Sequence, residues 1–180
     1  VTGLGITGSV RFTDTSEQLE VDLGAQNDSF YVRTTPSWLT TRIKMGEGFD
    51  TTYVGSGSNS LDDILGPLYI EGELPYADDV LFVNDYGDSS DNTYTISSEN
   101  IGVIEVPDPN NPIQTIELPV NETTIQRTGA AVIKYQTVEK VSLNTGAGDD
   151  TVNLLSTHLE LDPLEGNNSV FVINGGDGDD

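Results

Sequence analysis

The sequence contains no cysteine and only one histidine, which excludes disulfide bonds, thiolate catalysis, zinc ribbons and iron–sulfur clusters. Basic residues are also scarce, with 7 Lys and Arg against 30 Asp and Glu and a formal net charge of −23. Such a chain repels phosphate groups, so we expect neither nucleic acid nor an anionic membrane as a partner. No apolar run approaches the roughly 20 residues that span a bilayer, and membrane insertion is not expected.

Helical periodicity is lacking as well, whereas short apolar alternations recur along the whole chain. Examples are the runs 19–23, 80–83 and 170–173, which are rich in β-branched and aromatic residues and bounded by Gly, Asn, Asp or Pro. These are the signals of short β-strands. The length of 180 residues is that of one domain. The sequence therefore predicts a single all-β segment over residues 1–180.

One strand–turn–strand pattern recurs five times: an apolar strand, a Gly- or Asn-rich acidic turn, an Asp and a second apolar strand. The Asp residues that close the turns are Asp28, Asp50, Asp79, Asp150 and Asp180. Steps of 22, 29 and 30 residues separate Asp28 from Asp50, Asp50 from Asp79 and Asp150 from Asp180. Each step is about one turn of a wide β-solenoid. We expect a right-handed parallel β-solenoid of the β-helix or β-roll kind. The alternative is a β-sandwich of the adhesin type, which pairs its strands antiparallel.

A longer repeat overlies the short one, because residues 8–35 align with residues 129–157. The chain then holds about one and a half copies of a unit of roughly 120 residues. The partial copy is 1–78 and the second copy is 79–180. The Pro-rich stretch near 106–119 is expected to be a loop or insertion, because proline cannot donate to an interior ladder. The chain ends within the last acidic turn, which favours a segment cut from a longer protein.

Stacking would bring the turn carboxylates together. Neighbouring parallel strands lie about 4.8 Å apart. Two carboxylates about 5 Å apart repel by roughly 1 kcal/mol in water and about 3 kcal/mol at an effective dielectric of 20. A stack of them therefore needs cations. The turn glycines are expected to adopt φ > 0 and to turn backbone carbonyls toward a point beside the carboxylate.

A flexible site made only of oxygen ligands suits Ca²⁺ better than Mg²⁺ or Zn²⁺. The sequence thus predicts Ca²⁺ as the cofactor of the acidic turns. A further acidic loop over 84–92 has a similar density of ligand-like residues. The expected calcium-binding residues are Asp28, Glu47, Asp50, Asp79, Asp85, Asp88, Asp91, Asn144, Gly146, Gly148, Asp149, Asp150, Gly176, Asp177, Gly178, Asp179 and Asp180.

Two of the turns carry a family resemblance. The segments 145–152 (TGAGDDTV) and 175–180 (GGDGDD) resemble the nonapeptide G-G-x-G-x-D-x-U-x of RTX (haemolysin-type) calcium-binding repeats, although Thr145 replaces the first glycine. The resemblance implies a parallel β-roll with Ca²⁺ in its turns. RTX turns on one side recur about every 18 residues, so the longer steps here require wider turns. The chain also resembles the tandem units of very long bacterial surface and adhesin proteins.

These observations predict a calcium-stabilised structural repeat of a secreted or cell-surface bacterial protein, such as a stalk, adhesin, surface layer or filament subunit. Its partners would be adjacent copies of the repeat or identical subunits, joined end to end. An enzyme is not expected, because the basic residues do not cluster around a nucleophile or base and His158 reads as an exposed corner residue. The alternative is a calcium-dependent carbohydrate-binding module that contacts glycans or another cell surface. A polysaccharide lyase or hydrolase is the less favoured third hypothesis.

Overall fold

The computed structural model of the chain describes residues 17–72, 78–108, 111–156 and 170–180; His158 lies outside them. The described residues form twelve strands and no helix. None of them forms a helix able to cross a membrane. The strands are β1 (Gln18–Asp22), β2 (Ser29–Val32), β3 (Thr40–Lys44), β4 (Thr51–Val54), β5 (Leu68–Glu71), β6 (Val80–Asn84), β7 (Thr93–Asp108), β8 (Asn111–Arg127), β9 (Ile133–Gln136), β10 (Lys140–Asn144), β11 (Thr151–Leu154) and β12 (Val170–Asn174).

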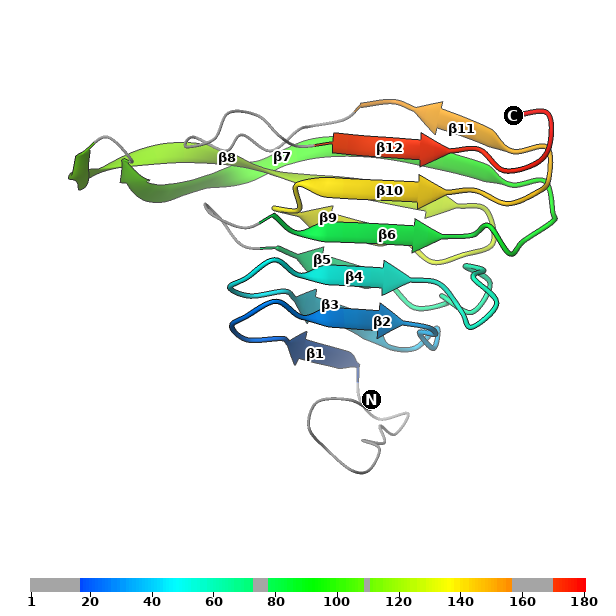
Figure 1. Cartoon of the computed structure of the whole chain (residues 1–180), viewed down its shortest axis with the longest axis horizontal. Helices are drawn as coiled ribbons and strands as arrows, with labels where there is room; N and C mark the ends of the chain where they lie inside the picture. The colour runs from blue at the N-terminus through cyan, green and yellow to red at the C-terminus, as the bar shows by residue number, and fades with distance from the viewer. Residues whose placement is uncertain (1–16, 73–77, 109–110, 157–169) are drawn as a thin grey trace.

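The strands form two sheets (Figure 1). One has seven strands in the order β1-β3-β5-β9-β8-β7-β11, and the other has five in the order β12-β10-β6-β4-β2. From β1 to β7 the chain passes back and forth between the sheets, and it does so again from β9 to β12. Strands β1, β11, β2 and β12 are the outer strands, so neither sheet closes on itself.

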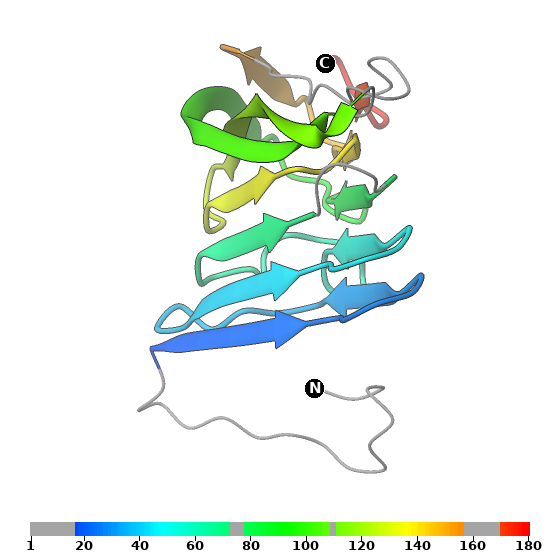
Figure 2. The same ribbon diagram turned by 90° about the vertical axis from the view of Figure 1, so that its left-hand side faces the viewer.

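Strand pairing is parallel everywhere in the described residues except at β8. In the five-stranded sheet β4 pairs with β6, β6 with β10 and β10 with β12, all parallel and in register. We call one strand of each sheet together with the connection between them a rung; the rungs lie one above another in Figure 2. The prediction of an all-β chain is confirmed. The mostly parallel pairing differs from the antiparallel pairing of the alternative, a β-sandwich.

The core lies between the two sheets and follows the alternation of the strands. In β3 every second residue is buried, and Ile43 points inward while Arg42 and Lys44 do not. Ile43 belongs to one buried cluster that continues from rung to rung and includes Val54, Leu81 and Leu143 of the five-stranded sheet. Burying one such side chain contributes about 1.5–3 kcal/mol. The rungs are therefore held by a continuous apolar stack.

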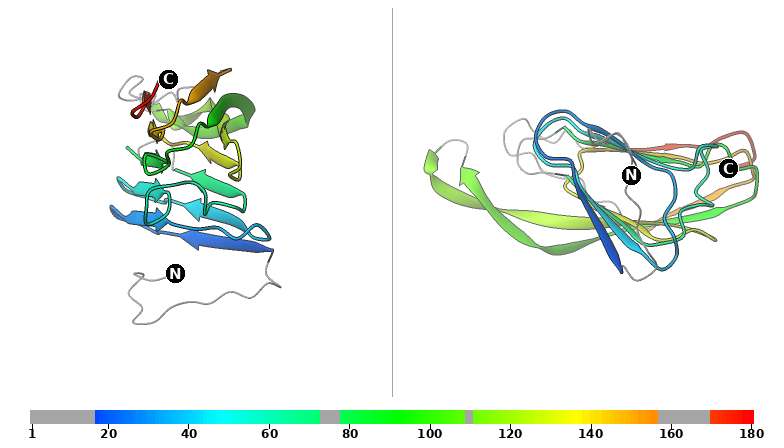
Figure 3. Two further views of the ribbon diagram at one scale, coloured as in Figure 1. Left: turned by 90° about the vertical axis from the view of Figure 1, so that its right-hand side faces the viewer. Right: turned by 90° about the horizontal axis from the view of Figure 1, so that it is seen from below.

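The sequence predicts a loop or an insertion in the Pro-rich stretch near 106–119. Its described residues, 106–108 and 111–119, belong to the outer parts of β7 and β8, an antiparallel hairpin that extends to one side of the sheets (Figure 3). The hairpin interrupts the alternation between the sheets as an insertion does, but its residues lie in strands and not in a loop. Strand β9 pairs with β8 only from Glu122 to Ile125. Pro107 and Pro119 lie beyond this region and beyond the pairing of β7 with β11, where proline's missing N–H breaks no bond to a further strand.

The long repeat relates strands of different sheets. It aligns Val21 with Val141 and Asp28 with Asp150. Val21 lies in β1 of the seven-stranded sheet, whereas Val141 lies in β10 of the five-stranded sheet. The repeated element is thus a strand–turn–strand unit that the chain uses at both sides of the stack.

Candidate functional site

The connections between the sheets gather at two edges of the stack. Edge 1 contains the described connections from the seven-stranded to the five-stranded sheet. These are 23–28, 45–50, residues 72 and 78–79 of the connection between β5 and β6, and 137–139. Edge 2 contains the connections in the opposite direction, 33–39, 55–67, 85–92 and 145–150, and the segment 175–180 that follows β12. The five Asp residues of the recurring pattern divide between these edges.

Edge 1 carries a ladder of four acidic residues, which we call ladder 1. The backbone N–H of Asp28 donates to Oδ1 of Asp50 at 2.6 Å, and that of Asp50 donates to Oδ1 of Asp79 at 3.0 Å. The N–H of Asp79 donates to Oε2 of Glu139 at 2.9 Å. The carboxylates of Asp50, Asp79 and Glu139 therefore each accept a hydrogen bond from the rung before them. The sequence predicts the three Asp residues but misses Glu139.

Ladder 1 is largely buried. Asp50 and Asp79 are 0 % exposed and Glu139 is 7 % exposed. Burial raises the pKa of Asp50 and raises that of Glu139 to about 8, in each case against a backbone hydrogen bond that favours the charged form. Oδ2 of Asp50 is buried and has no hydrogen-bond partner. A buried carboxylate oxygen of this kind is a candidate ligand for a cation.

Edge 2 carries the corresponding ladder 2, made of Asn92, Asp150 and Asp180. The N–H of Asn92 donates to Oδ1 of Asp150 at 2.9 Å, and the N–H of Asp150 donates to Oδ1 of Asp180 at 3.1 Å. Oδ2 of Asp150 accepts a further bond of 3.0 Å from the N–H of Gly146 in its own turn. Both carboxylate oxygens of Asp150 thus accept hydrogen bonds from backbone N–H groups.

A parallel outer ladder lies beside ladder 2. The N–H of Asp149 donates to Oδ1 of Asp91, and the N–H of Asp179 donates to Oδ1 of Asp149, each at 3.0 Å. All three of these side chains are exposed. The sequence predicts them as ligands, and the structure brings them into one row. Edge 2 therefore presents two adjacent rows of acidic residues.

The turn glycines differ between the two edges. In edge 1, Gly24, Gly46 and Gly48 have φ > 0, as the sequence predicts. The glycines of edge 2 have a different role. Of Gly146, Gly148, Gly176 and Gly178, only Gly178 has φ in the left-handed range. The prediction of φ > 0 is wrong for the other three. They lie so close to the rung before them that a Cβ on Gly146 or Gly148 would be 2.3 Å from a backbone carbonyl oxygen, and one on Gly176 would be 1.5 Å from one. Glycine is required there by backbone stacking.

The 23–28 turn shows the opposite case. Gln26 occupies the position of the second glycine and has φ of 95°. It aligns with Gly48 of the next rung, where a Cβ would lie 2.5 Å from the Gln26 carbonyl oxygen. The turn therefore keeps its shape without the second glycine of the pattern.

Asn144 belongs to a separate amide ladder at the end of three strands. Its Nδ2 donates to Oδ1 of Asn84 at 2.7 Å, and its Oδ1 accepts from Nδ2 of Asn174 at 2.6 Å. Both ends of the amide are thus used within the five-stranded sheet. Of the other predicted ligands, Glu47 and Asp177 are exposed, and the backbone of Glu47 pairs with the turn before it.

Asp85 and Asp88 already have a cationic partner. Arg127 Nε lies 2.7 Å from Oδ2 of Asp85, and Nη2 of the same guanidinium pairs with Asp88. Three other acidic candidates have no such cationic partner within the described part of the chain. Among the described residues no Lys or Arg forms a salt bridge with Asp50, Asp150 or Asp180. The described residues also contain no group of three His or acidic side chains that converges as a metal site. A bound ion would need backbone oxygens as well.

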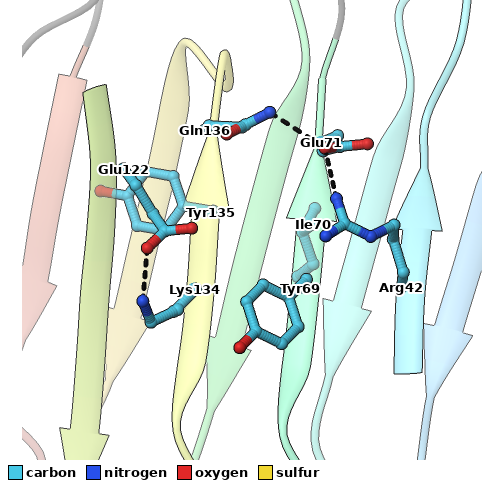
Figure 4. Close-up of a pocket in the computed structure, with 8 residues that line it drawn as sticks. All are labelled: Arg42, Tyr69, Ile70, Glu71, Glu122, Lys134, Tyr135 and Gln136. Carbon is cyan, nitrogen blue, oxygen red and sulfur yellow. Dashed lines mark hydrogen bonds and ion pairs between the residues drawn. The ribbon is translucent and has the colours of Figure 1, made fainter. Parts of the chain in front are cut away.

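The outer face of the seven-stranded sheet has a shallow depression (Figure 4). Arg42 pairs with Glu71 and Lys134 with Glu122, and both cations lie over the ring of Tyr69, at 5.3 and 5.9 Å from its centroid. The volume is about 10 Å³, the room of about one water molecule. The charged side chains pair with one another across the strands.

Aromatic side chains stack on the outer face of the five-stranded sheet. The rings of Tyr31 and Tyr53 have centroids 4.7 Å apart, and those of Tyr53 and Phe82 are 5.1 Å apart, with interplanar angles of 9° and 8°. Neighbouring rings cover one another's faces, and the guanidinium of Arg33 lies 5.3 Å from the Tyr31 ring. The faces that stack on sugars are thus largely occupied. This row of stacked rings stabilises the packing of neighbouring rungs.

Comparison with protein-family models, with curated proteins and with solved structures finds no match to this chain. Inference about its function therefore depends on the geometry of the two edges.

Proposed function

We propose that the chain is a calcium-stabilised structural repeat of a secreted or cell-surface bacterial protein, built as a right-handed parallel β-solenoid and joined end to end with adjacent copies. The observation that carries this proposal is the pair of ladders at the edges. In each, an acidic side chain of one rung accepts the backbone N–H of the rung before it. These repeated hydrogen bonds hold neighbouring rungs together, and in the described residues the ladder side chains line no pocket.

The solenoid is supported by the path of the chain. Successive rungs pair in parallel in both sheets, and the chain alternates between the sheets at each step outside the hairpin. Parallel strands joined by crossovers take the right-handed path in about 98 % of proteins. A stack of this kind is extended, and each rung contacts only its neighbours. Such a shape suits a stalk or a filament.

Calcium is supported by charge and by ligand chemistry. The chain has a net charge of −23, and Asp150 and Asp180 are ladder neighbours without a basic partner among the described residues. The available ligand atoms are carboxylate and backbone oxygens, which fit Ca²⁺. The buried Oδ2 of Asp50 is one such atom and has no hydrogen-bond partner. A bound ion would neutralise the repulsion between rungs, and the ladders would place its ligands.

End-to-end joining is supported by the outer strands. β11 and β12 form one end of the stack (Figure 1) and have no strand beyond them among the described residues. Leu154 and Ile173, from these two strands, are 52 % and 38 % exposed. Unpaired strand edges are templates for a further strand. A further rung in the same parallel register would pair both strands and cover these side chains.

The experiment is thermal unfolding of the 180-residue chain, followed by circular dichroism in Ca²⁺, in Mg²⁺ and in EGTA. A single site at 100 times its Kd adds about 2.7 kcal/mol, which raises the Tm of a chain of this size by roughly 5–10 °C. We expect that rise in Ca²⁺ and a much smaller one in Mg²⁺. Identical melting curves in Ca²⁺ and EGTA would contradict the proposal.

A further inference from the structure

One arginine lies inside edge 2, where two connections meet the base of the hairpin. Arg127, the last residue of β8, is 4 % exposed. Its Nη1 lies 2.8 Å from Oδ1 of Asp62, its Nε lies 2.7 Å from Oδ2 of Asp85, and its Nη2 pairs with Asp88. Asp62 belongs to the 55–67 connection, and the other two belong to 85–92. The guanidinium thus joins three segments of the chain.

The carboxylate of Asp85 is fully buried and well supplied with donors. The N–H of Leu61 and the hydroxyl of Tyr94 donate to its two oxygens, each at 2.7 Å. Burial raises the pKa of Asp85, and the hydrogen bonds and the charge of Arg127 oppose that rise. Removing the charged partner of such a group leaves an uncompensated charge in the interior. Arg127 is therefore the counter-ion that this part of edge 2 requires.

The 85–92 turn is also the base on which the acidic turns stack. The N–H of Ala147 donates to the carbonyl of Asp88 at 2.8 Å, and the N–H of Asn92 donates to Asp150. The 175–180 segment stacks in turn on 145–150. Only the lowest of these three turns has a guanidinium among its carboxylates in the described structure.

We infer that the guanidinium of Arg127 is a built-in cation of edge 2, which holds the 85–92 turn folded without a divalent ion. The two turns above it, 145–150 and 175–180, then stack on a preformed rung when calcium binds. The second statement rests on the proposed function, because it requires that those turns depend on calcium. The first does not.

Hydrogen exchange of the unmodified chain separates the two statements. In EGTA we expect the Leu61 amide, which donates to Asp85, to stay protected, and the Asp150 amide, which donates to Asp180, to exchange at least 100-fold faster than in Ca²⁺. If removing Ca²⁺ speeds the exchange of the Leu61 amide as much as that of the Asp150 amide, the inference about Arg127 is wrong. If the Asp150 amide is equally protected in both conditions, the proposed calcium dependence fails while Arg127 keeps its role.

A substitution then tests the cation itself. Arg127→Gln leaves Asp62, Asp85 and Asp88 without their guanidinium, so in EGTA we expect its Tm to fall by about 10 °C. In equilibrium dialysis it should bind one Ca²⁺ more than the unmodified chain, and Ca²⁺ should restore most of the lost Tm. The matched control is Arg42→Gln, whose guanidinium pairs with Glu71 on the outer face and is 30 % exposed. It should bind no additional Ca²⁺ and lose at most a few degrees.

An unchanged Tm or an unchanged number of bound ions in Arg127→Gln would overturn the inference. Should this variant stay unfolded in both conditions, Arg127→Lys keeps the positive charge and must fold in EGTA with no additional Ca²⁺. A Lys variant that folds only in Ca²⁺ would equally overturn the inference.

Discussion

The backbone N–H of Asp50 donates a 3.0 Å hydrogen bond to Oδ1 of Asp79, which lies 29 residues further along the chain and one rung further along edge 1. The same relationship joins Asp28 to Asp50 and Asp150 to Asp180. In ladders 1 and 2 the donor belongs to the earlier rung and the acceptor to the later one, whereas the outer ladder of Asp91, Asp149 and Asp179 runs in the opposite direction. The stack thus has a direction, and a joined copy must continue it with the same polarity. For the end-to-end joining proposed above, ladders 1 and 2 favour head-to-tail contacts, because a head-to-head contact would bring like groups of these ladders together.

The pKa of Glu139 predicts how stability depends on pH. Burial raises this pKa to about 8 from an ordinary value of 4.5, so between these values the folded state holds a proton that the unfolded state has lost. The contribution of Glu139 to stability is complete below pH 4.5 and is lost as pH rises toward 8, by about 1.4 kcal/mol per pH unit. We expect Glu139→Gln to remove this dependence. Urea unfolding at pH 5, 6, 7 and 8 measures it.

The control for Glu139 is Glu47→Gln, which removes an exposed carboxylate from the same edge. It should keep the slope of the unmodified chain. Equal slopes in the unmodified chain and in Glu139→Gln would show that the carboxyl is not buried as the structure has it.

Gly148→Ala tests why the turns contain glycine. A Cβ there would lie 2.3 Å from the carbonyl oxygen of Ser90 in the rung below, so one of the two backbones must move. In Ca²⁺, where the 145–150 turn is stacked, we expect a loss of about 1–3 kcal/mol in the free energy of unfolding, as for overpacking elsewhere. The loss should be smaller in EGTA. In Gly57→Ala the new Cβ would meet only Nη1 of Arg33 at 3.9 Å, and this control should be nearly neutral. A Gly148→Ala chain as stable in Ca²⁺ as the unmodified chain would show that the two turns do not stack this closely.

The ladder positions are readable from the sequence because each lies at the start of a strand. Asp50 directly precedes β4 and Asp79 directly precedes β6, and the apolar alternation marks both strands. Glu139 directly precedes β10 in the same way. It was missed because its connection, 137–139, is short and has no Gly-Asp signal. An acidic residue immediately before an alternating strand is the feature that would have found it.

Two other features lack a local signal. Asp85 and Asp88 resemble metal ligands in sequence, but their cation is Arg127, 39 or more residues further on, and only the stacking of rungs brings it there. Prolines such as Pro107 and Pro119 make the sequence predict a loop or an insertion where the structure has the strands of the hairpin. Those prolines are compatible with strands only because the outer part of the hairpin is unpaired on its far sides, which depends on tertiary structure.

Asn144→Ala tests whether this residue belongs to the amide ladder or to a calcium site. The change removes one bond to Asn84 and one from Asn174 and should lower the free energy of unfolding by about 1–2 kcal/mol. The loss should be equal in Ca²⁺ and in EGTA, as measured by urea unfolding. Asn153→Ala, at an exposed position of β11, is the control and should be nearly neutral. A loss restricted to Ca²⁺ would make Asn144 a ligand.

Asp150→Asn separates the backbone role of this residue from its charge. Alanine would remove the acceptors of the Asn92 and Gly146 amides and so destabilise the stacked turn through lost hydrogen bonds as well as through lost charge. Asparagine keeps one carbonyl acceptor, and ladder 2 already contains a natural Asn at position 92. In EGTA we expect a Tm close to that of the unmodified chain. The side-chain NH₂ of the new asparagine cannot accept the hydrogen bond from the Gly146 N–H, but the loss of charge also removes the repulsion between position 150 and Asp180, and the two effects offset each other.

In Ca²⁺ the same variant should lose its share of the calcium-dependent rise in Tm, about 2.7 kcal/mol if one site at 100 times its Kd is abolished. The matched control is Asp63→Asn, which removes the same charge from an exposed side chain outside both ladders and should respond to Ca²⁺ like the unmodified chain. If Asp150→Asn gains as much from Ca²⁺ as Asp63→Asn does, the charge of Asp150 has no part in binding. Ladder 2 would then be a purely structural device, in which the carboxylate serves only the amides of Asn92 and Gly146.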